Sequence, residues 1–216
     1  MNKKNKAFII LPILLFILFI ILAICVKLNL TLNFDNLVYG EVVKIMCTKV
    51  TFIMKVVTHI GDPISVFLIC VALLLIPKSR KTIAIPVSVT VIMAAIANTI
   101  LKNSFLRERP NILRLVNVSS YSFPSGHAMG NSALYTILIL LTFKYIKSKP
   151  KKIILSIVFI LITMTIGFSR VYLGVHYATD ILGGWLLGVG IGIIGYLLWI
   201  KEKFIYKYNS KKIKQK

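Results

Sequence analysis

The sequence predicts an all-α integral membrane bundle of six transmembrane helices, with an interfacial helix after the first span. Of its 216 residues, 57% are hydrophobic and 15% are charged, whereas a soluble domain averages about 45–50% apolar and about 25% charged residues. A single core of this size cannot hide that apolar excess from water. The composition therefore excludes a soluble enzyme and a disordered regulator, and we expect one membrane domain over residues 1–216.

Six apolar runs approach the length that crosses a hydrocarbon core about 30 Å thick. They cover residues 8–26, 63–76, 83–101, 127–143, 153–168 and 181–200. A cleaved signal peptide is the alternative for the first run, but no small-residue cleavage site follows it, so we expect an uncleaved helix. The second run is short, and it is expected to be tilted or to begin earlier.

The stretch 41–58, between the first two runs, has two faces. Its polar side chains, Lys44 and Lys55 among them, fall on one helical stripe, and its apolar side chains fall on another. Such a helix is expected to lie at the membrane interface instead of crossing the bilayer. Asp62 and Pro63 then predict the start of the second span, with Asp62 as the N-cap and Pro63 in the first turn.

The sixth run carries Gly184, Gly188 and Gly192 at four-residue spacing. Small residues at this spacing form a stripe along which a second helix can approach closely in lipid. The stripe is therefore expected to serve helix packing and not catalysis.

The basic residues predict the orientation of the bundle. The chain has 27 Lys and Arg against 6 Asp and Glu, a net charge of +21. Six spans put both termini on one side, and if that side is the cytoplasm, most basic residues fall in cytoplasmic segments, as the positive-inside rule requires. The basic tail, 201–216, would contact the anionic inner leaflet of the plasma membrane or simply fix the topology. Because the charges flank apolar runs, nucleic-acid binding is not needed to explain them.

With this orientation, polar residues collect on the extracytoplasmic face in three segments, 102–110, 124–127 and 169–180. Ionisable groups close to the membrane are costly and rarely lack a role. Two histidines, a carboxylate and several cations would meet there. The sequence therefore places its candidate site at the outer ends of four helices.

The cations and the helix start suit a phosphate group. Lys102, Arg109 and Arg170 supply positive charge and several N–H donors. Ser125 adds a hydroxyl, and Gly126 permits close backbone approach where a helix begins and free N–H groups favour anions. These parts are predicted to bind a phosphoryl group without a metal ion.

His176 and Asp180 are four residues apart, so on a helix their side chains would meet on one face. A carboxylate bonded to one ring nitrogen fixes the tautomer and leaves the other nitrogen free to attack. His176 is therefore the predicted nucleophile, and Asp180 is the residue that orients it. His127 is the predicted general acid that protonates the leaving oxygen.

Each of these residues has an ordinary structural alternative. Lys102 alone could be a juxtamembrane charge, and His176 with Asp180 could be an interfacial pair that anchors a helix. Their coincidence on one face favours a catalytic site. His59 lies outside the three segments, and it is expected to be an interfacial residue with a local partner, Asp62.

The three segments together resemble the signature of the type 2 phosphatidic acid phosphatase superfamily. Its three parts are matched, in order and in spacing, by Lys102-x6-Arg109-Pro110, Pro124-Ser125-Gly126-His127 and Ser169-Arg170-x5-His176-x3-Asp180. The family includes bacterial lipid phosphatases, glucose-6-phosphatase and vanadium haloperoxidases. This chain resembles the membrane members and not the soluble haloperoxidases, which lack spans.

The resemblance implies hydrolysis of a phosphomonoester or diphosphate through a phosphohistidine, with no metal and no cofactor. It implies the same catalytic roles for His176, Asp180 and His127. It also implies phosphate binding by five residues: Lys102, Arg109, Ser125, Gly126 and Arg170.

The expected substrate is a lipid phosphate held in the bilayer: undecaprenyl diphosphate, phosphatidylglycerophosphate or phosphatidic acid. Two alternatives stay open. One is transfer of the phosphoryl group to another acceptor, and the other is a non-enzymatic lipid or anion transporter. Against a transporter, the chain has no obvious internal repeat and no charged residue deep within a span. The sequence does not determine the oligomeric state or whether the loop 107–123 acts as a lid.

Overall fold

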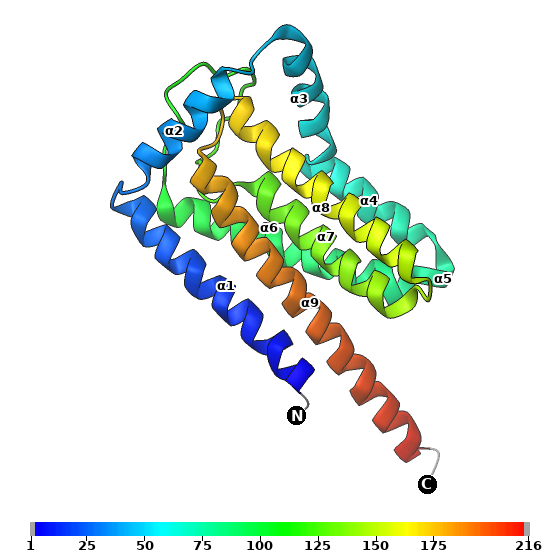
Figure 1. Cartoon of the computed structure of the whole chain (residues 1–216). Helices are drawn as coiled ribbons and strands as arrows, with labels where there is room; N and C mark the ends of the chain where they lie inside the picture. The colour runs from blue at the N-terminus through cyan, green and yellow to red at the C-terminus, as the bar shows by residue number, and fades with distance from the viewer. Residues whose placement is uncertain (1–2, 214–216) are drawn as a thin grey trace.

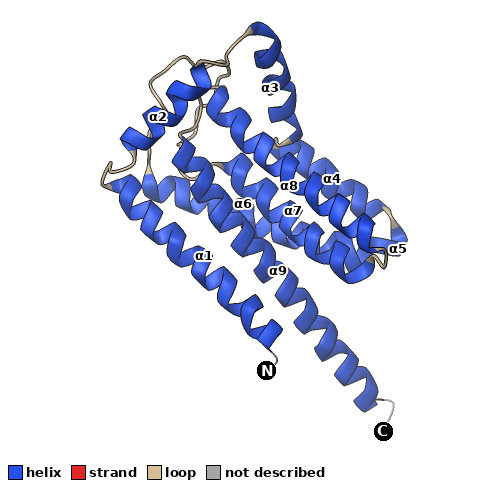
Figure 2. Ribbon diagram, in the orientation of Figure 1, coloured by secondary structure: helices blue, strands red, loops and turns tan. Residues whose placement is uncertain are grey.

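The computed structural model describes residues 3–213, with side chains from residue 8 to residue 201, and within that range every regular element is a helix (Figures 1 and 2). In chain order the helices are α1 (Lys3–Lys27), α2 (Leu32–Val43), α3 (Thr48–Ile60), α4 (Pro63–Leu75), α5 (Pro77–Ser79), α6 (Ile85–Phe105), α7 (Gly126–Tyr145), α8 (Lys149–Tyr172) and α9 (Ala178–Ile213). A π-helical turn, Arg80–Ala84, joins α5 to α6.

Helix α7 is the centre of the bundle. It packs against α9, α8, α6 and α4, and α1 lies along α9 (Figure 1). Many side chains in the first half of α7 are fully buried, including Met129, Ala133 and Leu134. Apolar side chains on the outer helices are instead exposed, as at Ile10 of α1 and Leu161 of α8. A helix bundle surrounded by lipid requires such apolar side chains on its outer surface.

The predicted glycine stripe is confirmed as a packing surface. A Cβ added to Gly188 would lie 1.9 Å from Ser132 Oγ and 2.3 Å from the carbonyl oxygen of Met129, and Gly184 and Gly192 are similarly crowded by α7. Only glycine allows two helix backbones to come this close. The stripe therefore brings the start of α9 against the start of α7.

Within the described part of the chain, four helices are long and apolar enough to cross a membrane: Phe8–Lys27, Pro77–Phe105, Lys149–Tyr172 and Ala178–Lys201. Helices α3 and α4 meet the same criteria only as a pair, bent by 47°. The protein is therefore a multi-pass membrane protein with four or five candidate spans by length and composition. Helix α7, which corresponds to the predicted fourth span, is present as a helix but begins with a polar turn.

Two predicted boundaries were wrong. The stretch 41–58 is not one helix, because the chain leaves α2 at Val43 and enters α3 at Thr48. The candidate third span begins at Pro77 and not at residue 83, because the basic residues Lys78, Arg80 and Lys81 lie in helical turns that lead into α6. The π-helical turn precedes Pro86, whose missing N–H cannot continue an α-helical ladder.

The two ends of the bundle differ. The first turn of α1 and the last turn of α9 lie at one end, and the connections from α6 to α7 and from α8 to α9 lie at the other (Figure 1). The predicted basic tail, 201–216, falls almost entirely outside the residues whose side chains are described. The three motif segments therefore meet at the end away from the helix ends that carry the termini.

Candidate active site

The three motif segments are assembled by the meeting of four helices. The first segment closes α6 and enters the following loop, the second opens α7, and the third closes α8 and opens α9. The backbone N–H of Ser125 donates to the carbonyl oxygen of Asp180 over 3.0 Å. This bond joins the beginning of α7 to the beginning of α9, so distant parts of the chain form one site.

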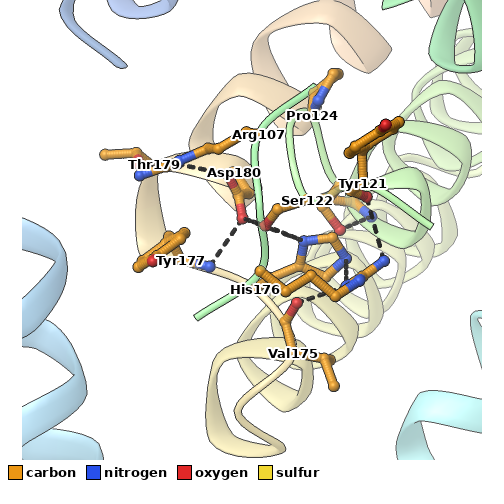
Figure 3. A network of polar contacts seen from close by, with 12 residues as sticks. Arg107, Tyr121, Ser122, Pro124, Val175, His176, Tyr177, Thr179 and Asp180 are labelled. Carbon is orange, nitrogen blue, oxygen red and sulfur yellow. Dashed lines mark hydrogen bonds and ion pairs between the residues drawn. The ribbon is translucent and has the colours of Figure 1, made fainter. Parts of the chain in front are cut away.

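His176 and Asp180 form a buried hydrogen-bonded pair. His176 Nδ1 lies 3.2 Å from Asp180 Oδ2, and the two residues are 3% and 0% exposed. His176 itself is not helical, because α9 begins at Ala178. The chain turns back at this point, since the N–H of Tyr177 donates to Asp180 Oδ2 over 2.8 Å (Figure 3). The two side chains therefore meet at a helix start and not along a helix face.

Further donors fix the Asp180 carboxylate. Arg107 Nη1 lies 2.6 Å from Oδ1, and the Ser122 hydroxyl donates to Oδ2. Figure 3 shows these groups gathered around the carboxylate, with the His176 ring beside it. A carboxylate held from several sides cannot rotate, and it therefore fixes the orientation of the imidazole.

The free nitrogen of His176 faces a cation. His176 Nε2 lies 3.3 Å from Arg109 Nη1, and Arg109 also donates to the carbonyl oxygens of Ser120 over 2.6 Å and of Val175. Burial lowers the pKa of His176 to about 3, and it also lowers the pKa of Arg109. The imidazole is therefore neutral near pH 7 and keeps the lone pair that a nucleophile needs.

Lys102 and Arg170 complete the cationic wall. Lys102 Nζ donates to the carbonyl oxygen of Tyr121, and Arg170 Nη1 donates to Thr58 Oγ1 over 2.6 Å. Arg170 is 4% exposed, and its Nε is buried with no hydrogen-bond partner among the described residues. A buried guanidinium with an unused donor is suited to receive an oxyanion.

Within the turn 124–127, Ser125 caps a helix, whereas Gly126 lines a cavity. Ser125 is fully buried, and its hydroxyl oxygen accepts from the N–H of Ala128, so it caps α7. Gly126 lines the cavity described below, and a Cβ there would lie 3.0 Å from Asn98 Oδ1. Asn98 also donates to the carbonyl oxygen of Pro124 over 3.1 Å, which anchors the turn to α6. Phosphate binding by Ser125 stays a prediction.

His127, the predicted general acid, has a partner that the sequence did not assign. Its Nε2 lies 2.8 Å from Asp62 Oδ1, and Asp62 Oδ2 lies 2.7 Å from His59 Nδ1. Asp62 does stand at the N-cap position of α4, but its side chain makes no capping bond there. The predicted local pair of His59 and Asp62 is confirmed. The prediction that this pair lies apart from the candidate site is wrong, because Asp62 also contacts His127.

Asp35 and Arg107 are also part of the site, and sequence reasoning gave neither a role. Asp35 Oδ2 lies 2.9 Å from Arg107 Nη2, and Asp35 accepts from both the N–H and the hydroxyl of Thr179. Asp35 is 2% exposed. It therefore ties α2 to the start of α9 and to the arginine that holds Asp180.

A cavity of about 700 Å³ opens from the site between α4 and α6. Its polar end is lined by Lys102, Arg109, His127, Arg170 and His176. Its walls are mostly apolar and include Val66, Phe67, Val91 and Ile92. No group of three His, Cys, Asp or Glu side chains within the described range is arranged to hold a metal ion. The cavity thus combines a cationic head with a long apolar body.

Comparison with known proteins identifies the family. The family model of the PAP2 superfamily matches residues 83–204, more than half of the chain and all three motif segments. The chain belongs to the PAP2 superfamily. Within it, the chain is 34% identical to phosphatidylglycerophosphatase B of Bacillus subtilis (strain 168), over 82% of this chain and 89% of that protein. It is 28% identical to an undecaprenyl-diphosphatase of Sulfolobus acidocaldarius, over 83% and 87% of the two chains.

A solved structure shares the architecture of this PAP2 protein. The crystal structure of a transmembrane PAP2-type phosphatidylglycerolphosphate phosphatase from Bacillus subtilis superposes with a TM-score of 0.76 at 29% identity. The superposition covers 91% of this chain and 96% of that one. The family and these relatives make the protein a lipid phosphatase that hydrolyses phosphoric ester bonds, and the resemblance found in the sequence is confirmed.

Proposed function

We propose that this PAP2 phosphatase hydrolyses the phosphate or diphosphate head group of a membrane lipid through a phosphohistidine at His176 Nε2. One observation carries the proposal: the Nδ1 side of the ring is bonded to Asp180, while Nε2 faces Arg109 at the polar end of an apolar cavity. A histidine nucleophile needs one ring nitrogen held by a partner and the other facing the site where the substrate binds.

The reaction follows from these positions. Nε2 attacks phosphorus, the bond to the leaving oxygen breaks, and His127 gives that oxygen a proton. Water then attacks the phosphohistidine, His127 takes the proton back, and the bond from phosphorus to Nε2 breaks. Lys102, Arg109 and Arg170 neutralise the equatorial oxygens throughout. Gly126 and the start of α7 would contribute backbone N–H groups, and Ser125 would contribute its hydroxyl.

The cavity supports a lipid substrate. Its lining on α6 extends from Ser88 to Asn103, which is about 22 Å at 1.5 Å per residue. An acyl or prenyl chain fits between α4 and α6 while the head group reaches the cations. Phosphatidylglycerophosphate and undecaprenyl diphosphate, the compounds after which two relatives are named, are the first substrates we propose. Phosphatidic acid offers the same phosphomonoester chemistry.

The proposed membrane arrangement has six spans, with α4 as the second and α7 as the fourth. Both termini would be cytoplasmic, the site would face the extracytoplasmic side of the plasma membrane, and α2 and α3 would lie at that interface. Two observations support it. The motif segments and the terminal helix ends lie at opposite ends of the bundle, and basic residues are concentrated in the segments that would be cytoplasmic.

Phosphate release from each lipid by the purified protein in detergent tests this function. We expect release from at least one of the three lipids, undiminished by a metal chelator. Absence of release from every lipid would contradict the proposal. Phosphate release that occurs without the chelator and is lost when the chelator is added would contradict the metal-independent chemistry of the proposal.

A further inference from the structure

We propose that Asp62 is a positioning residue for His127. In this assignment, Asp62 holds the imidazole through Nε2 and leaves Nδ1 to exchange the proton with the leaving oxygen. The inference rests on the proposed function, because it concerns the proton donor of that reaction. It also makes the corner between α3 and α4, residues 58–62, part of the active site.

The contacts of Asp62 define its role. Its two carboxylate oxygens are divided between His127 Nε2 at 2.8 Å and His59 Nδ1 at 2.7 Å. The His127 side chain is 14% exposed and the His59 side chain is 74% exposed, so Asp62 stands between a nearly buried ring and a surface ring. Since Nε2 is occupied, Nδ1 is the ring nitrogen left for a substrate in the cavity that His127 lines.

The backbone around Asp62 is built to hold it beside α7. Asn131 Nδ2 donates to the carbonyl oxygens of both Gly61 and His127 over 2.9 Å. A Cβ on Gly61 would lie 2.5 Å from Ile166 Cγ2 and 3.3 Å from His127 Cδ2. A larger residue would push the corner away, so this close approach fixes the separation between the carboxylate and the imidazole.

The same corner contacts the phosphate-binding machinery. Thr58, one turn before Asp62, accepts from Arg170 Nη1 over 2.6 Å and is 2% exposed. The α3–α4 corner thus holds one cation of the phosphate site and the proton donor together. A segment with only a structural role would not need to contact both.

Electrostatics explains why a carboxylate is required. Arg170 and Lys102 line the cavity together with His127, and both oppose a positive charge on its ring. Asp62 is the acidic side chain in contact with that ring among the described residues, and its negative charge favours the protonated form. Protonated His127 gives its Nδ1 proton to the leaving oxygen as the phosphorus–oxygen bond breaks. The proton on Nε2 stays on the ring and is donated in the hydrogen bond to Asp62. Nδ1 then regains a proton from the attacking water.

Asp62→Asn, compared with His127→Gln, tests the inference on two kinds of substrate. With a lipid phosphomonoester, whose alkoxide leaving group needs a proton, we expect the single-turnover rate of alcohol release to fall by about 10–100-fold. With nitrophenyl phosphate, whose phenolate leaves without one, we expect the single-turnover burst of nitrophenol to change by less than about threefold. Steady-state turnover should slow on both substrates, because His127 also takes the proton of the attacking water. His127→Gln should show the same selectivity, and the double variant should be no slower than His127→Gln alone.

Glu41→Gln is the matched control, because it also removes a carboxylate but from an exposed pair with Lys44 on α2. It should leave both rates unchanged. Asp62→Glu, which keeps the charge, should retain more lipid activity than Asp62→Asn, and it decides the matter if Asp62→Asn does not yield folded protein. Equal losses in the single-turnover rates on both substrates, or multiplying losses in the double variant, would overturn the inference. Failure of wild-type protein to release lipid phosphate would instead overturn the proposed function.

Discussion

Among the residues whose side chains the structure describes, three aspartates contact the candidate site: Asp35, Asp62 and Asp180. Each one contacts a group to which the proposed mechanism gives a role, namely Arg107, His127 and His176. Asp35 and Asp180 are buried, and a buried carboxylate without a partner is costly, so each of these two lies beside a cation or an imidazole.

His176→Gln should abolish turnover while the protein still folds. The glutamine amide cannot form the bond to phosphorus, so we expect kcat to fall by about 10³-fold or more on both lipid and nitrophenyl substrates. Phosphate release measures the rate, and acid-labile labelling by radioactive substrate measures the intermediate. Labelled protein in this variant would show that the nucleophile lies elsewhere.

Asp35→Asn should weaken both stability and turnover. The change removes one of the two carboxylates that pair with Arg107, and it removes the negative charge that accepts from Thr179 at the start of α9, so we expect a loss of about 1–3 kcal/mol in stability. Because Arg107 also holds Asp180, kcat should fall on lipid and nitrophenyl substrates alike. Thermal unfolding in detergent and both rates are the readouts, with Glu41→Gln on the same helix as control. An unchanged melting temperature would show that this ion pair contributes nothing.

Acidification should destabilise the folded protein through His176. Burial lowers its pKa from 6.5 to about 3, so the unfolded chain binds a proton on this residue where the folded chain does not. Its contribution is fully present above pH 6.5 and is lost as the pH falls from 6.5 toward 3. His176→Gln should therefore lose stability less steeply across that window, as measured by thermal unfolding at each pH. Parallel curves for the two proteins would contradict the neutral buried imidazole.

At the scale of elements, close approach between helices places the side chains of the candidate site. The glycine stripe of α9 sets its start against α7, and Gly61 sets the α3–α4 corner against His127. Helix ends, not helix middles, then carry the chemistry. A change in the spacing of two helices should consequently alter the site without touching a catalytic residue.

Gly188→Ala should destabilise the bundle, whereas Gly190→Ala should not. The new Cβ at position 188 would overlap Ser132 and the backbone of Met129, which cannot move aside cheaply. At position 190 the nearest atom is Phe16 Cζ at 3.5 Å, an ordinary contact. We expect a loss of about 1–3 kcal/mol for the first and less than about 0.5 kcal/mol for the second. Equal melting temperatures in detergent would mean that the stripe is not tightly packed.

At the scale of the whole molecule, the motif segments lie at one end of the bundle, and the helix ends that carry the termini lie at the other (Figure 1). The exposed apolar sides of α1 and α8 face outward, as lipid-facing helices do. The cavity between α4 and α6 leads from the apolar body toward the cations, so a lipid could bring its head group to the site without leaving the bilayer. The orientation of the bundle in the membrane is therefore the property to measure.

Cysteine labelling in intact cells should report that orientation. In a variant lacking Cys25, Cys47 and Cys70, Asn117→Cys should react with an impermeant maleimide added outside, because position 117 lies in the loop between α6 and α7. Lys147→Cys, in the loop between α7 and α8, should react only after the cells are permeabilised. The reverse pattern would invert the proposed topology, and labelling of both from outside would contradict six spans.

The sequence by itself determined the membrane class, the family and most helix positions. Composition and the length of an apolar run are properties of each segment alone. The spacing of the signature residues is likewise read from their order in the chain, without knowledge of how the helices pack. It failed at 41–58 and near Pro77, where local turns broke or extended the helices.

Only the tertiary structure decided which residues support the catalytic ones. Asp35 and Asp62 lie far from the motif segments along the chain, and nothing in their local sequence distinguishes a site carboxylate from a surface charge or a helix cap. Their roles arise when α2 meets α9 and when the α3–α4 corner meets α7. A hydrogen bond depends on two groups coming within about 3 Å, and that distance is set by the packing of helices and not by their order.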